Sequence, residues 1–161
     1  MVTSWRTRIS AMAHTHVSCL LHVVFSTKGR AALITSTIRS RLHAMLATIA
    51  ADRKFPAMIV GGVEDHVHLL MSLPADRPIS DCLRVLKGTS SKWINDEFFP
   101  DRSFAWQDGY GAFAISPSHA DATVAYIRNQ EEHHRVRTFQ DEYRDFLQRQ
   151  GIVGDERYMW G

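Results

Sequence analysis

Apolar and polar positions come in blocks along the chain, and the spacing within each block predicts a helix or a strand. Residues His16 to Ser26 are largely apolar and β-branched, which predicts a first strand that ends at a polar turn, residues 27–30. From Thr35 to Asp52 apolar side chains recur every three or four residues, which is typical of an amphipathic helix. The apolar positions of this helix are Ile38, Leu42, Met45, Leu46 and Ile49.

Two short apolar runs follow, Ala57 to Val63 and His66 to Leu73, and the acidic pair between them predicts a hairpin. Gly61 and Gly62 are expected to loosen its first strand. A helix is predicted from Ile79 or Ser80 to about Glu97. Alternation and glycines between Phe104 and Ser116 predict one or two further strands.

The C-terminal third of the chain predicts two more helices. Ser118, with Asp121 three residues later, is typical of a helix start, and this helix carries Tyr126 and Gln130 toward His133 and His134. Thr138 is expected to cap a last helix that ends at Gly151. The order of the elements predicts an α+β fold of the ferredoxin-like, split βαβ type. We expect a central antiparallel sheet with helices on one face and added C-terminal helices.

The length of 161 residues suits a single domain, which we expect over residues 14–161. Residues 1–13 have no clear periodicity and are expected to form a flexible extension, with Met12 as an alternative start. The two cysteines, Cys19 and Cys82, do not indicate a disulfide framework, and a reducing cytoplasm is expected. No apolar run approaches the roughly 20 residues that a membrane span needs, so no membrane association is expected.

Positive charge is concentrated in the first part of the chain. The net charge is only +2, yet residues 1–60 contain eight lysines or arginines and a single acid, Asp52. Such a distribution favours binding of a polyanion, because cations near phosphates release condensed counterions. Solvated helix faces explain the charges equally well.

Four residues form a candidate site for phosphate chemistry. In a strand, alternate side chains face one side, so His66 and His68 can hold one ion. In a helix, residues four apart share a face, so Tyr126 and Gln130 can present a phenol and an amide to the same place. Two imidazoles and an amide oxygen leave open positions on a divalent ion, which favours Mg²⁺ or Mn²⁺.

Each of these residues also has a simpler explanation. The histidines can be partly buried strand residues with satisfied nitrogens, Tyr126 a core residue and Gln130 a surface amide. His133 and His134 are expected to end the helix, where cations complement its dipole. The nearby acids are expected to be solvated; they are Glu64, Asp65, Glu131 and Glu132.

Several motifs together resemble the single-tyrosine transposases of the insertion-sequence 200/605 group, which belong to the HUH nucleases. The similarity extends from about His22 to Trp160 and includes Glu-Asp-His-Val-His-Leu-Leu, Leu-Lys-Gly-Thr-Ser-Ser-Lys-Trp and Tyr-Ile-Arg-Asn-Gln-Glu-Glu-His-His. The resemblance implies that Tyr126 is the nucleophile and that His66, His68 and Gln130 are the metal ligands. No nucleotide cofactor is implied.

The resemblance also implies a substrate and an assembly. Members of the family cut single-stranded DNA at hairpin-bearing element ends and form a 5′-phosphotyrosine and a free 3′-hydroxyl. They are homodimers in which the histidines of one subunit meet the tyrosine helix of the other. The candidate DNA contacts are Lys28, Arg30, Lys87, Ser90, Ser91 and Lys92.

Two other functions fit the same residues. A domesticated relative would cut repeated extragenic palindromes without moving an element of its own. A non-catalytic regulator would retain the fold and bind DNA or RNA without metal-dependent nicking. An exposed amphipathic helix face is the alternative explanation for the polar residues between Lys87 and Lys92.

Overall fold

The computed structural model describes residues 16–153, so the predicted extension over residues 1–13 lies outside the described residues. The strands are β1 (Leu20–Ser26), β2 (Ala57–Gly62), β3 (His66–Ser72) and β4 (Gly111–Ile115). The helices are α1 (Ser36–Asp52), α2 (Ile79–Phe98), α3 (Ala120–Arg128), α4 (Gln130–His134) and α5 (Phe139–Arg149), with short 3₁₀ turns at Lys28–Arg30 and Pro117–His119. None of the helices in this part of the chain is long and apolar enough to cross a membrane.

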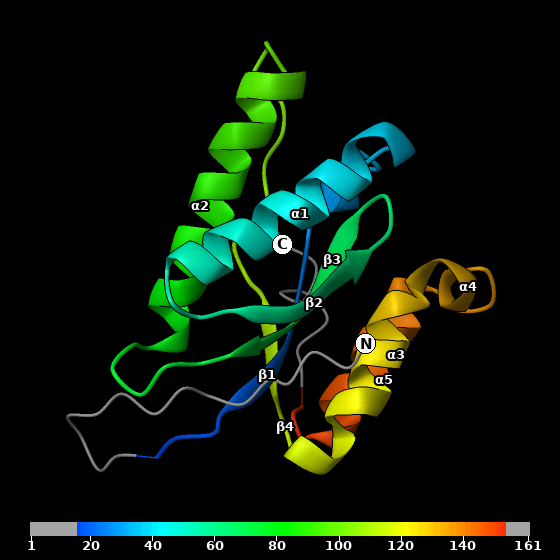
Figure 1. Ribbon diagram of the computed structural model, residues 1–161. Helices are drawn as coiled ribbons and strands as arrows, with labels where there is room; N and C mark the ends of the chain where they lie inside the picture. Colours follow the sequence, from blue (N-terminus) through cyan, green and yellow to red (C-terminus); the bar gives the residue numbers. More distant parts are fainter. Residues whose placement is uncertain (1–15, 154–161) are drawn as a thin grey trace.

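The four strands form one antiparallel sheet in the order β2-β3-β1-β4. In this order α1 connects β1 to β2, and α2 connects β3 to β4, which is the split βαβ arrangement. Helices α1 and α2 cover one face of the sheet, and α3 to α5 lie on the other (Figure 1). The predicted ferredoxin-like fold with added C-terminal helices is therefore confirmed.

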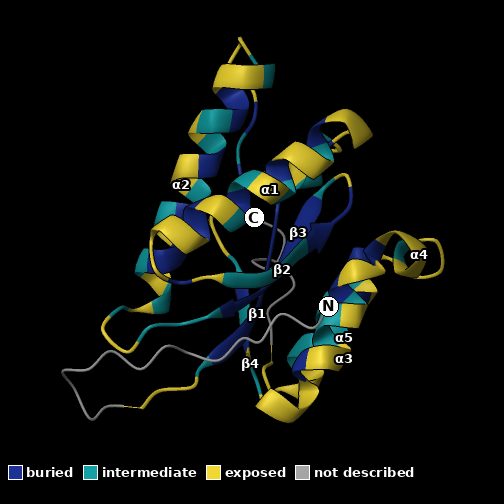
Figure 2. Ribbon diagram, viewed as in Figure 1, coloured by how far each residue is buried: buried dark blue, intermediate teal, exposed yellow. Residues whose placement is uncertain are grey.

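The main core lies between the sheet and α1 and α2. Alternate residues of β1 and β3 point into it, and they meet the predicted apolar stripe of α1. Figure 2 shows the strands largely buried and the outer sides of the helices exposed. Fully or nearly fully buried members of this core are Val23, Phe25, Leu42, Leu46, Val67, Leu69, Leu83 and Leu86.

The prediction of one or two strands between Phe104 and Ser116 agrees with the structure, which has β4 there and, among the described residues, one isolated bridge between Thr27 and Trp106. Two predicted boundaries are corrected. The first strand begins at Leu20 rather than His16. The third helix is not continuous to the histidines, because Asn129 leaves the helical region with φ −96° and ψ 23°. Asparagine is a weak helix former, so a break at this position is locally inexpensive.

The predicted caps have different outcomes. The Thr138 side chain accepts a hydrogen bond from the backbone N–H of Asp141, as expected at the start of α5. Gly151 follows the end of this helix with φ +66°, a conformation that glycine adopts without a steric penalty. Ser118, in contrast, lies in a 3₁₀ turn, and α3 begins without a side-chain cap.

Candidate functional site

The histidines of β3 face away from the main core, as strand alternation requires. Val67, Leu69 and Met71 point toward α1 and α2, so His66 and His68 point toward α3 to α5. Both histidines are fully buried. The sheet therefore carries an apolar core on one side and two adjacent imidazoles on the other.

One ring nitrogen of His66 is held by a carboxylate. His66 Nδ1 donates to Asp65 Oδ1 at 2.7 Å, and Asp65 Oδ2 accepts from Arg30 Nη2 at 2.7 Å. Burial alone would raise the pKa of Asp65, but the hydrogen bonds and charges of His66 and Arg30 outweigh it and lower that pKa. A carboxylate in this position fixes the ring and leaves His66 Nε2 available. Asp65 is thus not the solvated turn residue that we expected.

His68 is held by a third histidine, His22, from β1. His22 Nε2 and His68 Nδ1 lie 2.9 Å apart in a hydrogen bond. Burial lowers the pKa of His22 to about 4, and burial followed by the neighbouring histidine charges lowers the pKa of His68 well below its usual value. Both rings are therefore neutral at pH 7, which is the form that binds metals.

A close approach at Gly61 brings the tyrosine helix onto this surface. Gly61 pairs with His68 in the sheet, and a Cβ at Gly61 would lie 2.4 Å from the backbone oxygen of Ile127. Such a contact excludes any side chain at this position, so α3 packs directly on β2. Ile127 is fully buried at this contact, and its neighbour Tyr126 therefore lies next to His68.

Tyr126 lies beside the histidines of its own chain. Its ring centroid is 6.0 Å from that of His68 and 5.9 Å from that of His22. The Tyr126 hydroxyl is buried without a hydrogen-bond partner among the described residues. The structure therefore brings Tyr126 next to His68 within one chain, as the spacing predicted.

Gln130 also reaches this place, although the helix break separates it from Tyr126. It is 1% exposed, and its Oε1 accepts a hydrogen bond from His134 Nε2 at 3.0 Å. Its Nε2 donates to Glu142 Oε1 at 3.4 Å. Burial, with a smaller effect of His66, lowers the pKa of His134 to about 4, so its ring is neutral at pH 7.

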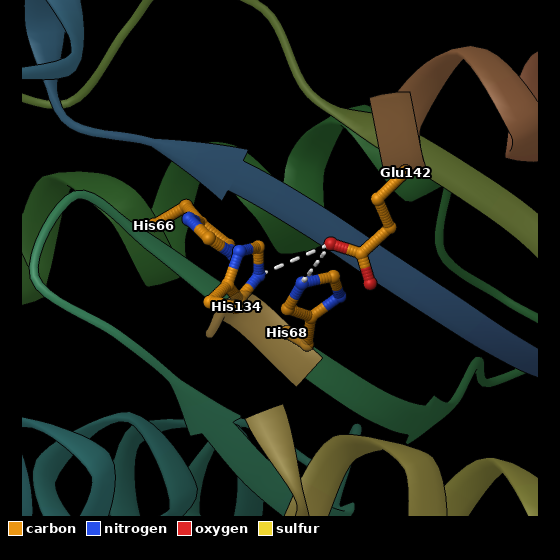
Figure 3. A group of neighbouring side chains, drawn as sticks. All are labelled: His66, His68, His134 and Glu142. Atoms are coloured by element: carbon orange, nitrogen blue, oxygen red, sulfur yellow. Dashed lines mark ion pairs between the residues drawn. The ribbon is translucent and has the colours of Figure 1, made fainter. Parts of the chain in front are cut away.

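Glu142, on α5, completes a cluster that the sequence did not predict. Ligand atoms of His66, His68, His134 and Glu142 lie within 4.8 Å of one another, and Figure 3 shows the four side chains converging. Burial, with a smaller effect of Asp145, raises the pKa of Glu142 to about 7. The missed signal is that Glu142 lies on the same helical face as Phe139 and Phe146, where a charged residue is unexpected.

Unpaired atoms mark the centre of this cluster. The buried atoms without a hydrogen-bond partner among the described residues include His66 Nε2, His68 Nε2, Glu142 Oε2 and the Tyr126 hydroxyl. Buried polar atoms are nearly always paired, so such a concentration fits a group that binds between them. Imidazole and carboxylate donors at this spacing fit a divalent cation.

A pocket of about 660 Å³ adjoins the Tyr126 side of the cluster. Tyr126, His22 and Glu142 contribute to its wall, and so do Arg149 and Arg137, which pairs with Asp145 at 2.6 Å. Arginines bind phosphate oxygens through paired N–H groups. The pocket is thus a candidate approach for a nucleic-acid backbone toward the tyrosine.

The predicted DNA contacts differ in their surroundings. Lys28 and Lys92 are exposed, although Lys92 also pairs with Asp96 at 2.6 Å. Arg30 is engaged by Asp65 and lies over the ring of Phe139 at 5.0 Å. DNA binding by all three cations stays a prediction.

The other three predicted contacts lie on α2. Lys87 Nζ donates to the backbone oxygens of residues 107–109, at 2.6 to 3.0 Å. Ser90 is buried and accepts a hydrogen bond from Trp106 Nε1 at 3.0 Å. Ser91 and Lys87 line a surface pocket of about 450 Å³ next to Tyr110. Lys87 and Ser90 thus take part in intramolecular hydrogen bonds, and DNA contacts by all three residues stay predictions.

Comparisons with known proteins give one consistent result. The family model described as "Transposase IS200 like" matches residues 15–130. The transposase for insertion sequence element IS200 of Salmonella typhimurium is 25% identical over 132 residues, with 78% of this chain and 86% of that protein covered. The ISDra2 transposase TnpA of Deinococcus radiodurans is 30% identical over 116 residues, with 69% and 83% covered.

Two solved structures share the fold. One, from Deinococcus radiodurans and described as a transposase, has a TM-score of 0.61 at 23% identity and covers 76% of this chain and 98% of its own. The other, a REP-associated tyrosine transposase bound to a REP hairpin, has a TM-score of 0.57 at 18% identity and covers 78% and 74%. The family match ends at Gln130, so His134 and Glu142 lie beyond it.

Proposed function

The chain belongs to the family of IS200-like transposases, and from this premise we propose that it cuts and rejoins single-stranded DNA with Tyr126 as the nucleophile. One observation carries the proposal: the Tyr126 hydroxyl is buried without a hydrogen-bond partner among the described residues, beside the neutral imidazole of His68, whose Nε2 is also unpaired. The hydroxyl of a buried tyrosine normally has a hydrogen-bond partner. Its lack of one is consistent with a role toward substrate.

The proposed cleavage is a transesterification. The Tyr126 oxygen attacks phosphorus and loses its proton, while the bond from phosphorus to the 3′-oxygen breaks and that oxygen gains a proton. The products are a 5′-phosphotyrosine and a free 3′-hydroxyl. Because the phosphodiester energy is kept in the covalent bond, attack by a 3′-hydroxyl can rejoin the strand.

The histidines supply the proposed metal site. Asp65 and His22 hold His66 and His68 with their Nε2 atoms directed to a common centre. The family resemblance adds Gln130 as a third ligand. When bound, Mg²⁺ or Mn²⁺ would polarise a phosphoryl oxygen and stabilise its developing charge. The residues of the chain would hold the ion and leave open positions on it for the phosphate.

Hairpin-bearing DNA is the proposed substrate class. The REP-associated tyrosine transposase that shares this fold is bound to a hairpin. The cationic first part of this chain and the exposed Lys28 and Lys92 would suit a phosphate backbone. Arg137 and Arg149 would guide the cleaved strand toward Tyr126.

The proposal is tested by trapping the covalent product. The full chain is incubated with single-stranded DNA copied from both flanks of its reading frame, with Mn²⁺ or Mg²⁺, and separated on a denaturing gel. We expect a protein–DNA adduct that is absent for Tyr126→Phe and retained for the matched control Tyr110→Phe. An adduct that persists in Tyr126→Phe would refute Tyr126 as the nucleophile.

A homodimer with shared active sites is a further part of the proposal that comes from the family resemblance. Mixing Tyr126→Phe with His66→Ala protein tests the sharing, since each variant carries the residue that the other lacks. Restored cleavage would support sharing between subunits. No restoration would favour the arrangement seen within one chain, where Tyr126 lies beside its own His68.

A further inference from the structure

Three unpaired ligand atoms meet on the α5 side of the histidine pair. They are His66 Nε2, His68 Nε2 and Glu142 Oε2. Glu142 Oε2 lies 3.8 Å from His68 Nε2 and 3.2 Å from His134 Nε2, without hydrogen-bond geometry to either atom. The second nitrogen of each β3 histidine is already engaged, so all three free atoms are directed inward.

Among the described residues, no lysine or arginine forms an ion pair with the Glu142 carboxylate. It is 8% exposed, and among the described residues its ion-pair partners are only His68 and His134. A buried carboxylate without a lysine or arginine is costly, and it requires either a proton or a cation nearby. A divalent cation between the three atoms would satisfy both imidazoles and neutralise the carboxylate.

Gln130, the ligand expected from the family resemblance, is engaged elsewhere. Its Oε1 accepts the hydrogen bond of His134, and its Nε2 is directed to Glu142 Oε1. The amide oxygen thus already accepts one hydrogen bond, whereas the neighbouring carboxylate oxygen Glu142 Oε2 accepts none. In this arrangement Gln130 holds Glu142 and His134 in place.

We propose that Glu142, rather than Gln130, is the third protein ligand of the divalent ion, together with His66 and His68. The inference rests on the metal site of the proposed function and specifies its ligands. Helix α5 lies beyond the region matched by the family model, so this chain supplies the ligand from an added element. Two imidazoles with one carboxylate favour Mn²⁺ over Mg²⁺, which prefers oxygen ligands throughout.

Metal binding without DNA tests this assignment. Calorimetric titration of the metal-free full chain with Mn²⁺ is compared between wild type, Glu142→Gln, Gln130→Leu and the exposed control Glu132→Gln. We expect Glu142→Gln to weaken binding by at least about tenfold, Gln130→Leu to weaken it less, and Glu132→Gln to match wild type. Wild-type affinity in Glu142→Gln, or a larger loss in Gln130→Leu, overturns the proposal.

The outcomes separate this inference from the proposed function. If His66→Ala loses Mn²⁺ and Glu142→Gln retains it, the histidine site stands and the Glu142 ligand fails. If wild type does not bind Mn²⁺, both fail. Should Glu142→Gln not fold, the ¹³C signal of the Glu142 carboxyl is followed in the wild-type protein during titration with diamagnetic Zn²⁺. A shift larger than that of Glu132 supports ligation, and no shift overturns it.

Discussion

The two faces of the sheet are built from the same strands but differ in chemistry. Toward α1 and α2, residues such as Val23 and Leu69 are fully buried in a continuous apolar core. Toward α3 to α5, the alternate positions His22 and His68 carry imidazoles, and the apolar clusters are small. Strand alternation places stability on one face and chemistry on the other.

This division explains how the chain tolerates unpaired buried atoms. Each unpaired polar group costs about 1 to 3 kcal/mol, and several lie around Tyr126 and Glu142. The apolar face offsets this cost through burial of large side chains from four elements. The comparison therefore predicts that substitutions on the two faces will have different, separable effects.

The largest expected effect on stability comes from the apolar face. Leu69→Ala should lower the free energy of unfolding by about 2 to 5 kcal/mol, because it leaves a cavity in the main core. Urea denaturation followed by circular dichroism measures this loss. A loss below about 1 kcal/mol would show that this face does not carry the stability of the fold.

Gly61→Ala should displace α3 from the sheet, because the new Cβ would collide with the Ile127 backbone oxygen. We expect a loss of about 1 to 3 kcal/mol in unfolding free energy and a loss of covalent DNA attachment. The control is Gly88→Ala on α2, because a Cβ at this position would meet nothing within 4 Å. This substitution should stabilise the helix by about 0.5 to 1 kcal/mol. Equal behaviour of the two variants would contradict the close packing of α3 on β2.

Asp65→Asn should act on the metal site rather than on the fold. Loss of the carboxylate that holds His66 Nδ1 is expected to weaken Mn²⁺ binding about 10- to 100-fold. Calorimetry on the metal-free protein gives the affinity, and Asp76→Asn in an exposed loop is the matched control. An unchanged affinity would mean that the Asp65 contact does not orient the ligand.

The smallest expected effect on stability is that of Tyr126→Phe. The change removes a buried hydroxyl that has no partner, so the unfolding free energy should stay the same or rise by about 1 kcal/mol. Thermal and urea unfolding of the variant measure this difference while the adduct is lost. A clear destabilisation would indicate that the hydroxyl contributes to packing and not only to chemistry.

The sequence predicted what depends on local periodicity. The apolar stripe from Ile38 to Ile49 predicted the bounds of α1 almost correctly. Strand alternation correctly predicted that His66 and His68 lie on one side of the sheet. The helical spacing of Tyr126 and Gln130 also brought them to one place, even though Asn129 interrupts the helix. In each case neighbouring residues contain the required information.

The remaining features depend on contacts between distant elements. Glu142 approaches His68 only because α5 packs on the sheet, and no local pattern specifies that packing. Gly61 was expected to loosen a strand, but its role is visible only when Ile127 lies against it. From the sequence alone, Asp65 was interpreted as a solvated turn residue. Its role is visible only in its hydrogen bonds with Arg30 and His66.

The proposed third ligand lies on the last described helix, and this position affects when the protein can act. A ribosome completes the hairpin with His66 and His68 long before it reaches Glu142. Domains acquire their structure as translation proceeds, so the early sheet can form while the ligand set is still incomplete. If Glu142 is the ligand that we propose, a chain that ends before α5 would carry the histidines and the tyrosine but would lack the third metal ligand.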